Sequence, residues 1–152
     1  NKLFDDVKST IFRQTMFAEF EENIHAMQER GDGLTKDKIC NYYYQLNKKY
    51  FGHVQLTEET KYEWARIPHF FTAFYVYKYS TGISASLALA DRVLNGGKSE
   101  LEDYYKFLKS GGSRYPIDSL KLAGVDMSKP EPIQAALNKF ADLINQIENL
   151  NL

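Results

Sequence analysis

The sequence has few of the residues that bind metals or cross-link chains. Its 152 residues include one cysteine, Cys40, and three histidines. A lone cysteine cannot form a disulfide within the chain, so nothing calls for an oxidising compartment, and cysteine-rich zinc sites are excluded. The HExxH pattern that places two histidines on one helix face is absent, as are glycine-rich phosphate-binding loops. From its own residues the chain is unconvincing as a self-contained enzyme.

Charge of one sign and long apolar runs are also lacking. The formal net charge is −1, and acidic and basic residues are interspersed. Nucleic acids and anionic membranes require a concentrated basic face, so neither is expected as a partner. No stretch approaches 18 consecutive apolar residues, so no membrane span is expected. The segment "NKLFDDVKSTIF" shows no initiator methionine and no signal-peptide pattern. We therefore expect a cytoplasmic protein and a sequence that is part of a longer chain.

Apolar residues recur at helical spacing along most of the sequence, and no segment alternates long enough to predict a strand. We expect one helix to end at Gly31 and the next to be capped by Thr35. A further helix should begin at Pro116. Ser99 with Glu102 forms a further expected capping box. The expected helices cover about residues 3–30, 36–51, 57 onward, 68–94, 99–110, 116 onward and 133–150. The prediction is an all-α fold, a compact array of about six or seven helices in a single domain over residues 1–152.

Two histidines invite a comparison with metal sites. Glu22 and His25 match the Glu-x-x-His unit of di-iron bundles, but such sites need two units and two further glutamates. Only one unit is present, so we expect a solvated helix face there. His53 follows a glycine in a predicted loop and is expected on the surface.

The segment "IPHFFTAFYVYKYSTG", Ile67 to Gly82, holds one histidine, three phenylalanines and three tyrosines. At about 100° per residue, His69 and Tyr77 share a face of the expected helix, roughly 12 Å apart. Tyr75 and Tyr79 are four residues apart on another face. A cleft-lining role suits these polar rings. The alternative is that all of them are core residues whose polar tips bond to backbone carbonyls.

Four blocks of the sequence resemble oligoendopeptidase F, a zinc oligopeptidase related to thimet oligopeptidase. They are "FRQTMFAEFE", "IPHFFTAFYVYKYSTGISAS", "LKSGGSRYPIDSLKLAGVDM" and "PEPI", in this order. In that family an upstream HExxH helix and a later glutamate hold the zinc. Glu19, Glu21 and Glu22 do not match the third-ligand motif, so no metal ligand is carried over to this chain. The resemblance implies zinc in the complete enzyme, with ligands outside this sequence and none bound by this part.

The resemblance also implies site residues. His69 best matches the family's substrate-contacting histidine, and Tyr77 is the first choice as donor to the oxyanion. Tyr75 and Tyr79 are further substrate-binding candidates. This sequence departs from the thimet branch, because Phe70 and Phe74 stand where that branch offers hydroxyls. We expect Phe70, Phe71 and Phe74 to serve mostly in core packing. In the "GGSRYP" turn, Arg114 or Tyr115 either faces the cleft or serves the turn.

The sequence thus favours the C-terminal, substrate-binding and oxyanion-stabilising part of a zinc metalloendopeptidase that hydrolyses short peptides. By itself this part should be inactive. Its expected partners are short peptides, the missing N-terminal part of the same chain, and a second copy bound through exposed apolar surface on Leu3 to Met27. One alternative is a non-catalytic helical module that binds peptides in a tyrosine-lined groove. Another is a helical structural protein without a ligand, in which His69 and Tyr77 are buried.

Overall fold

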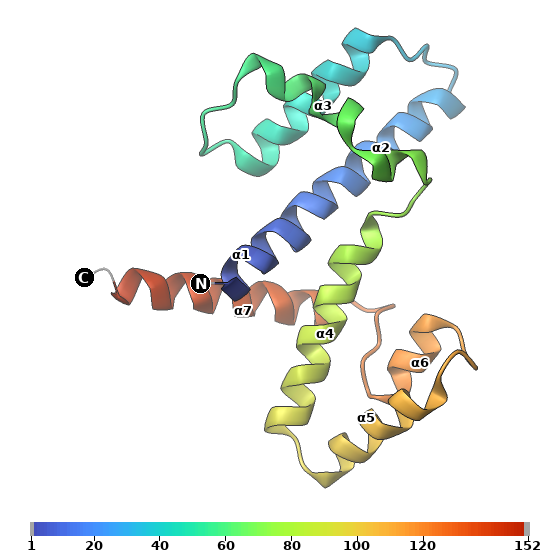
Figure 1. Ribbon diagram of the computed structural model, residues 1–152, viewed down its shortest axis with the longest axis vertical. Coiled ribbons are helices and arrows are strands. Elements are labelled where there is room, and N and C mark those ends of the chain that lie inside the picture. Colours follow the sequence, from blue (N-terminus) through green and yellow to red (C-terminus); the bar gives the residue numbers. More distant parts are fainter. Residues whose placement is uncertain (1, 151–152) are drawn as a thin grey trace. The chain divides into compact units, whose positions relative to one another are not determined.

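The structure, a computed structural model, describes residues 2–150, and every regular element among them is a helix (Figure 1). Seven α-helices, a π-helical turn and two 3₁₀ helices make up this part of the chain. The all-α prediction is therefore confirmed. No helix within residues 2–150 combines the length and the apolar character that a membrane span needs.

Backbone contacts divide the described residues into two compact units. The first unit comprises residues 8–80, and the second comprises residues 2–7 together with residues 81–150. Helix α4 (Tyr77–Asn95) begins in the first unit and continues into the second. That the two units form a single domain, as expected from the sequence, stays a prediction.

The first helical stretch matches the prediction closely. Helix α1 (Lys2–Val7), the π-helical turn η1 (Lys8–Phe12) and helix α2 (Arg13–Glu29) follow one another without a gap. Gly31 ends α2 with a left-handed backbone, φ 78°. The amide of Asp32 donates to the carbonyl of Met27 at 2.9 Å, which closes the helix end in the way glycine permits.

Helix α3 (Lys36–Phe51) begins where expected, because the Thr35 side chain accepts a hydrogen bond from the amide of Lys38. The segment after residue 57 forms the 3₁₀ helix η2 (Glu58–Arg66). Buried residues of α2, α3 and the chain beyond η2 make one core cluster: Met16, Phe17, Phe20, Tyr43, Leu46, Ile67 and Val76.

Two polar contacts attach η2 to this core. The indole nitrogen of Trp64 lies 3.4 Å from the sulfur of buried Cys40 on α3. The carboxylate of Glu63 accepts a hydrogen bond from the Tyr43 hydroxyl at 2.9 Å and pairs with Arg13 of α2 and Arg66. A short 3₁₀ helix without buried residues of its own is thereby fixed to both neighbouring α-helices.

The predicted continuous helix over residues 68–94 is wrong. Pro68 does begin a helical turn, but this 3₁₀ helix, η3, covers only Pro68–Phe71. The backbone leaves it at Thr72, passes through a left-handed conformation at Phe74 with φ 54°, and enters α4 at Tyr77. His69 and Tyr77 therefore belong to different elements. The shared helical face and the axial separation expected for these two residues do not exist.

In the second unit, α5 (Lys98–Ser110) and α6 (Pro116–Leu122) pack together, and α1 packs on α7 (Glu131–Leu150). The rings of Phe4 and Phe140 stack with centroids 5.0 Å apart. The expected capping box of Ser99 and Glu102 is wrong by two residues. Gly97 precedes the first turn instead, and its amide donates to the Glu100 carboxylate at 2.8 Å.

The apolar surface expected along Leu3 to Met27 is small. Leu3 is exposed, and Phe4, Phe12, Ile24 and Met27 are half-buried. Five other apolar side chains of this stretch are buried: Val7, Ile11, Met16, Phe17 and Phe20. Dimerisation through this surface stays a prediction.

Candidate functional site

The aromatic segment brings three of the predicted site residues into mutual contact within the first unit. The Nε2 atom of His69, in η3, lies 3.1 Å from the hydroxyl oxygen of Tyr79, in the first turn of α4. The Tyr75 ring stacks beside the imidazole with centroids 5.8 Å apart and an interplanar angle of 22°. Tyr75 and Tyr79 meet edge to face at 5.6 Å. The break in the helix makes this contact, because it folds residue 75 back onto η3.

The cluster is accessible rather than part of the core. His69 and Tyr75 are half-buried, and Tyr79 is 36% exposed. The hydroxyls and the imidazole of the cluster can therefore donate or accept hydrogen bonds at the surface of the unit. Which atom of the His69–Tyr79 pair carries the shared proton depends on the imidazole tautomer.

The electrostatics of the cluster favour the neutral phenol of Tyr79. A hydrogen bond with the side chain of Tyr75 raises the pKa of Tyr79, with smaller contributions from partial desolvation and from the charge that Tyr75 would carry when ionised. A phenol donates a hydrogen bond only while it is protonated, and this shift extends the protonated range of Tyr79 to higher pH. Lys78 lies over the Tyr75 ring, with Nζ 4.9 Å from the centroid.

Tyr77 lies between the two clustered tyrosines in sequence and is the first residue of α4. It is 49% exposed, so the structural alternative that buried it is wrong on this point. Residues two apart on an α-helix point in directions about 200° apart, so Tyr77 and Tyr79 leave α4 on nearly opposite sides. The role of Tyr77 as oxyanion donor stays a prediction.

The three phenylalanines of the segment differ in their surroundings. Phe70 packs as predicted, with its ring 5.4 Å from Phe17 and 5.2 Å from Phe20. Phe71 and Phe74 were also expected to be mostly packing, and this is wrong: they are 86% and 50% exposed. The reason is the helix break, because a continuous helix would have placed both residues on its core-facing side.

A contact that the sequence did not reveal holds the broken segment in place. Glu21 of α2 is 4% exposed, and its Oε1 atom accepts a hydrogen bond of 2.7 Å from the amide of Phe74. The Phe74 ring lies 4.6 Å from the imidazole of His25, whose Nδ1 is 2.8 Å from the carbonyl oxygen of Glu21. A glutamate in an amphipathic helix gives no local signal of such a contact, because its partner is 53 residues away.

The same residues border a small apolar cavity of about 250 Å³ in the first unit. Its lining includes Glu21, His25 and the η3 residues Phe70 and Phe71, next to His69 in the chain. Pockets that take whole small molecules are usually somewhat larger, so this volume suits a single side chain.

Acidic and imidazole groups do not gather into a metal centre within residues 2–150: no set of three or more His, Cys, Asp or Glu side chains is placed to hold an ion. Glu19 pairs with Lys49 at 2.7 Å, and the hydrogen bond from Lys49 holds the pKa of Glu19 below its usual value. Glu22 and His53 are exposed as predicted, whereas His25 is half-buried rather than on a solvated face.

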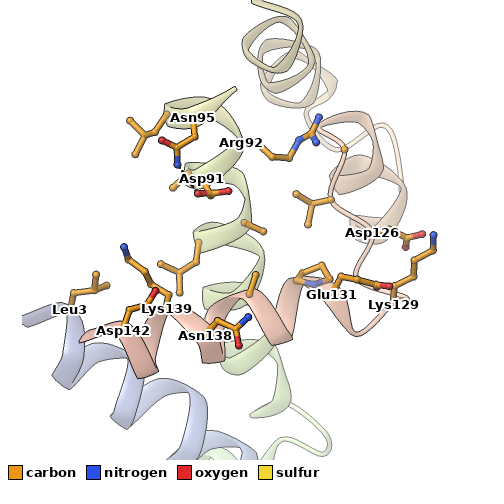
Figure 2. A pocket seen from close by; sticks show the side chains of 18 residues that line it. Leu3, Asp91, Arg92, Asn95, Asp126, Lys129, Glu131, Asn138, Lys139 and Asp142 are labelled. Carbon is orange, nitrogen blue, oxygen red and sulfur yellow. Dashed lines mark hydrogen bonds between the residues drawn. The ribbon is translucent and has the colours of Figure 1, made fainter. Parts of the chain in front are cut away.

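A larger, open cavity of about 950 Å³ lies in the second unit (Figure 2). Asp91, Arg92 and Asn95 of α4 face it, together with Lys139 and Asp142 of α7. Both acidic and basic groups line the cavity, so its charge selects no single class of ligand. In the same unit Arg114 and Tyr115 lie in the exposed turn before α6, where Tyr115 is 82% exposed.

Comparison with known proteins assigns the chain to one class of protein, the peptidases. The chain belongs to peptidase family M3, which matches residues 1–139. It is 49% identical to oligopeptidase PepF of Bacillus subtilis over 151 residues, which are 99% of this chain and 22% of the relative. It is 44% identical to the group B oligopeptidase PepB of Streptococcus agalactiae over 99% of this chain and 25% of that protein.

A solved structure shows the same relationship. The crystal structure of oligoendopeptidase-F from Enterococcus faecium superposes with a TM-score of 0.94 at 44% identity, covering all of this chain and 30% of that one. The predicted resemblance to oligoendopeptidase F is thus confirmed. The chain spans about a fifth to a third of the length of these relatives.

Proposed function

We propose that this chain is the C-terminal, substrate-binding part of a zinc metalloendopeptidase of the oligoendopeptidase F type, which hydrolyses short peptides. His69, Tyr75 and Tyr79 contact the backbone of a bound peptide, and a tyrosine hydroxyl donates to the oxyanion that forms when the scissile carbonyl is attacked. Membership of peptidase family M3 and the names of the relatives support the reaction class.

One observation carries the assignment of the site: the contact between His69 Nε2 and the Tyr79 hydroxyl, flanked by the stacked Tyr75 ring and open to solvent. A preorganised neutral donor stabilises a developing oxyanion because its orientation is fixed before the reaction. Tyrosine is protonated at neutral pH, and the raised pKa of Tyr79 extends this donating form to higher pH. The apolar cavity beside η3 is of a size to take one side chain of the same peptide.

Zinc belongs to the complete enzyme in this proposal. Its ligands lie outside residues 2–150, since this part of the chain offers no set of side chains that could hold it. In a family of this kind the metal supplies an activated water and polarises the scissile carbonyl. The contribution of this chain is confined to binding and orienting the peptide and to donating the hydrogen bond.

Tyrosine-to-phenylalanine substitutions in the complete enzyme test the proposal. Tyr77→Phe, Tyr79→Phe and the control Tyr105→Phe, an exposed tyrosine on α5, each remove one hydroxyl. Loss of the oxyanion donor should lower kcat by about 10²-fold or more, with a smaller change in KM. Tyr77 is the donor expected from the sequence and Tyr79 the one in contact with His69. If both Tyr77→Phe and Tyr79→Phe keep the wild-type kcat, neither tyrosine is the donor to the oxyanion.

Peptide binding without hydrolysis is the alternative for this chain, and the solvent exposure of Tyr77 and Tyr79 is compatible with it. Under that alternative the isolated chain binds short peptides by itself. Calorimetry with the substrates of the complete enzyme decides between the two: measurable binding by the isolated chain, together with an intact kcat in the tyrosine variants, supports the non-catalytic module.

A further inference from the structure

We propose that Glu21 is a positioning residue for the candidate site, which holds the segment of residues 72–76 so that Tyr75 stacks on His69. This inference rests on the proposed function for its catalytic consequence. Glu21 itself would touch neither substrate nor metal, since it lies buried on α2 and acts through the backbone of Phe74.

The segment needs an external anchor because its conformation is an unfavourable one. Phe74, with φ 54°, has a left-handed backbone, and within residues 2–150 it is the one residue other than glycine with a positive φ. A bulky side chain disfavours that region, and such residues persist only where the surrounding contacts determine them. Left without an anchor, residues 72–76 would relax toward ordinary backbone angles.

Glu21 supplies that anchor. Its Oε1 atom accepts the hydrogen bond from the Phe74 amide at 2.7 Å, and the Glu21 side chain is almost wholly shielded from solvent. Residue 74 is held a second time through its ring, which lies 4.6 Å from His25, one helical turn beyond Glu21 on the same helix. Two contacts from α2 therefore fix one residue of the segment.

The next anchor follows two residues later. Val76 is fully buried in the core cluster of the first unit. Tyr75 lies between a residue bound to α2 and a residue buried in the core, so the direction of its side chain is set by both. That direction brings its ring to 5.8 Å from His69 and 5.6 Å from Tyr79. The position of the cluster thus depends on a carboxylate outside it.

Three variants of the complete enzyme test this inference. Glu21→Met keeps the length of the side chain but removes the acceptor, and should lower kcat about tenfold or more and raise KM as well, because Tyr75 contacts the peptide. Glu21→Gln keeps an acceptor oxygen and should stay within about threefold of the wild-type kcat. Glu22→Gln changes the exposed neighbour of Glu21 and should behave as wild type. A kcat of Glu21→Met equal to wild type, or equal loss in the Met and Gln variants, overturns the inference.

Crystal structures of the same variants separate this inference from the proposed function. In Glu21→Met, residues 72–76 should shift and the His69–Tyr75 stacking should be lost, whereas Glu21→Gln should preserve both. An unmoved segment in Glu21→Met overturns the positioning role whatever the activity. The proposed function fails by a different result, which is an intact kcat in both Tyr77→Phe and Tyr79→Phe.

A second pair of variants covers the case in which Glu21→Met does not fold. Phe74→Gly and Phe74→Ala remove the same ring, but only glycine adopts a positive φ without cost. If the left-handed backbone at residue 74 places the cluster, Phe74→Gly retains a higher kcat than Phe74→Ala. The reverse order, or equal values, counts against the inference.

Discussion

The hydroxyl of Tyr43 donates a 2.9 Å hydrogen bond to Glu63 and so joins α3 to η2. Arg13 reaches the same carboxylate from α2. Burial alone would raise the pKa of Glu63, but the hydrogen bond from Tyr43 and the charge of Arg13 outweigh it, and the pKa lies below its ordinary value of 4.5. Burial and the Glu63 carboxylate raise the pKa of Tyr43 in turn, so that its hydroxyl stays a donor.

We expect Glu63→Gln to destabilise the 152-residue chain by about 1–3 kcal/mol at neutral pH, because Arg13 loses its charged partner. A lowered pKa in the folded state means that the stabilisation is complete above the ordinary value of 4.5 and is lost as pH falls through the lower value. The difference in unfolding free energy between wild type and variant should therefore shrink below about pH 4.5. Chemical denaturation at several pH values measures it.

Glu58→Gln is the matched control for this prediction. Glu58 lies on the same 3₁₀ helix and pairs with Lys61, but its side chain is 75% exposed. An exposed ion pair contributes little, so this variant should stay within about 1 kcal/mol of wild type. A Glu63→Gln variant as stable as Glu58→Gln would show that the Tyr43–Glu63–Arg13 contacts do not stabilise the unit.

Tyr79 should titrate above the ordinary tyrosine value of 10.0, because the Tyr75 side chain bonds to it. In Tyr75→Phe the pKa of Tyr79 should fall back toward that value, since the hydrogen bond is lost. NMR of ring-labelled tyrosine across alkaline pH follows the titration. Tyr115→Phe, at an exposed position in the other unit, should leave the Tyr79 titration unchanged. Titration of Tyr79 at or below 10.0 in the wild-type chain would contradict the contact.

Gly124→Ala should destabilise the chain by about 1–3 kcal/mol, because residue 124 has a left-handed backbone with φ 74°. A methyl group there would also lie 2.5 Å from the Arg92 guanidinium, which donates to the Ala123 carbonyl at 2.9 Å. Gly112→Ala is the control, since its added methyl group meets open space without a positive φ. Thermal unfolding of both variants compares them, and equal melting temperatures would refute the role of Gly124.

The purified 152-residue chain should retain no stoichiometric zinc after dialysis, because three or four ligands are needed and no such set exists among residues 2–150. Elemental analysis of the dialysed chain measures this directly. One equivalent of bound zinc would mean that His25, His53 or His69 takes part in a site that this conformation does not contain.

Local signals in the sequence predicted most of the helices. Thr35 as a cap, Gly31 as a left-handed end and Pro116 as a first-turn residue each act within a few positions, so the sequence around them is sufficient. The break at residues 72–76 has no such signal. Apolar spacing continues across it, and an aromatic residue with a positive φ contradicts local preference.

The candidate residues themselves were identified from their chemistry and from the family resemblance, whereas their arrangement was not. Pairing His69 with Tyr77 required a continuous helix. The structure pairs His69 with Tyr79 because a distant glutamate turns the backbone at Phe74. Such a tertiary contact is set by two segments at once, and neither contains evidence for the other.

The contact between Trp64 and Cys40 gives this protein a built-in optical reporter. The chain has one tryptophan and one cysteine, and the indole nitrogen lies 3.4 Å from the buried sulfur. Emission excited on the red side of the tyrosine absorption therefore comes from Trp64 and reports the docking of η2 on α3 without any label. The rate at which an alkylating reagent modifies the Cys40 thiol independently measures how fast η2 separates from α3. The wild-type chain therefore reports both the extent and the rate of this separation.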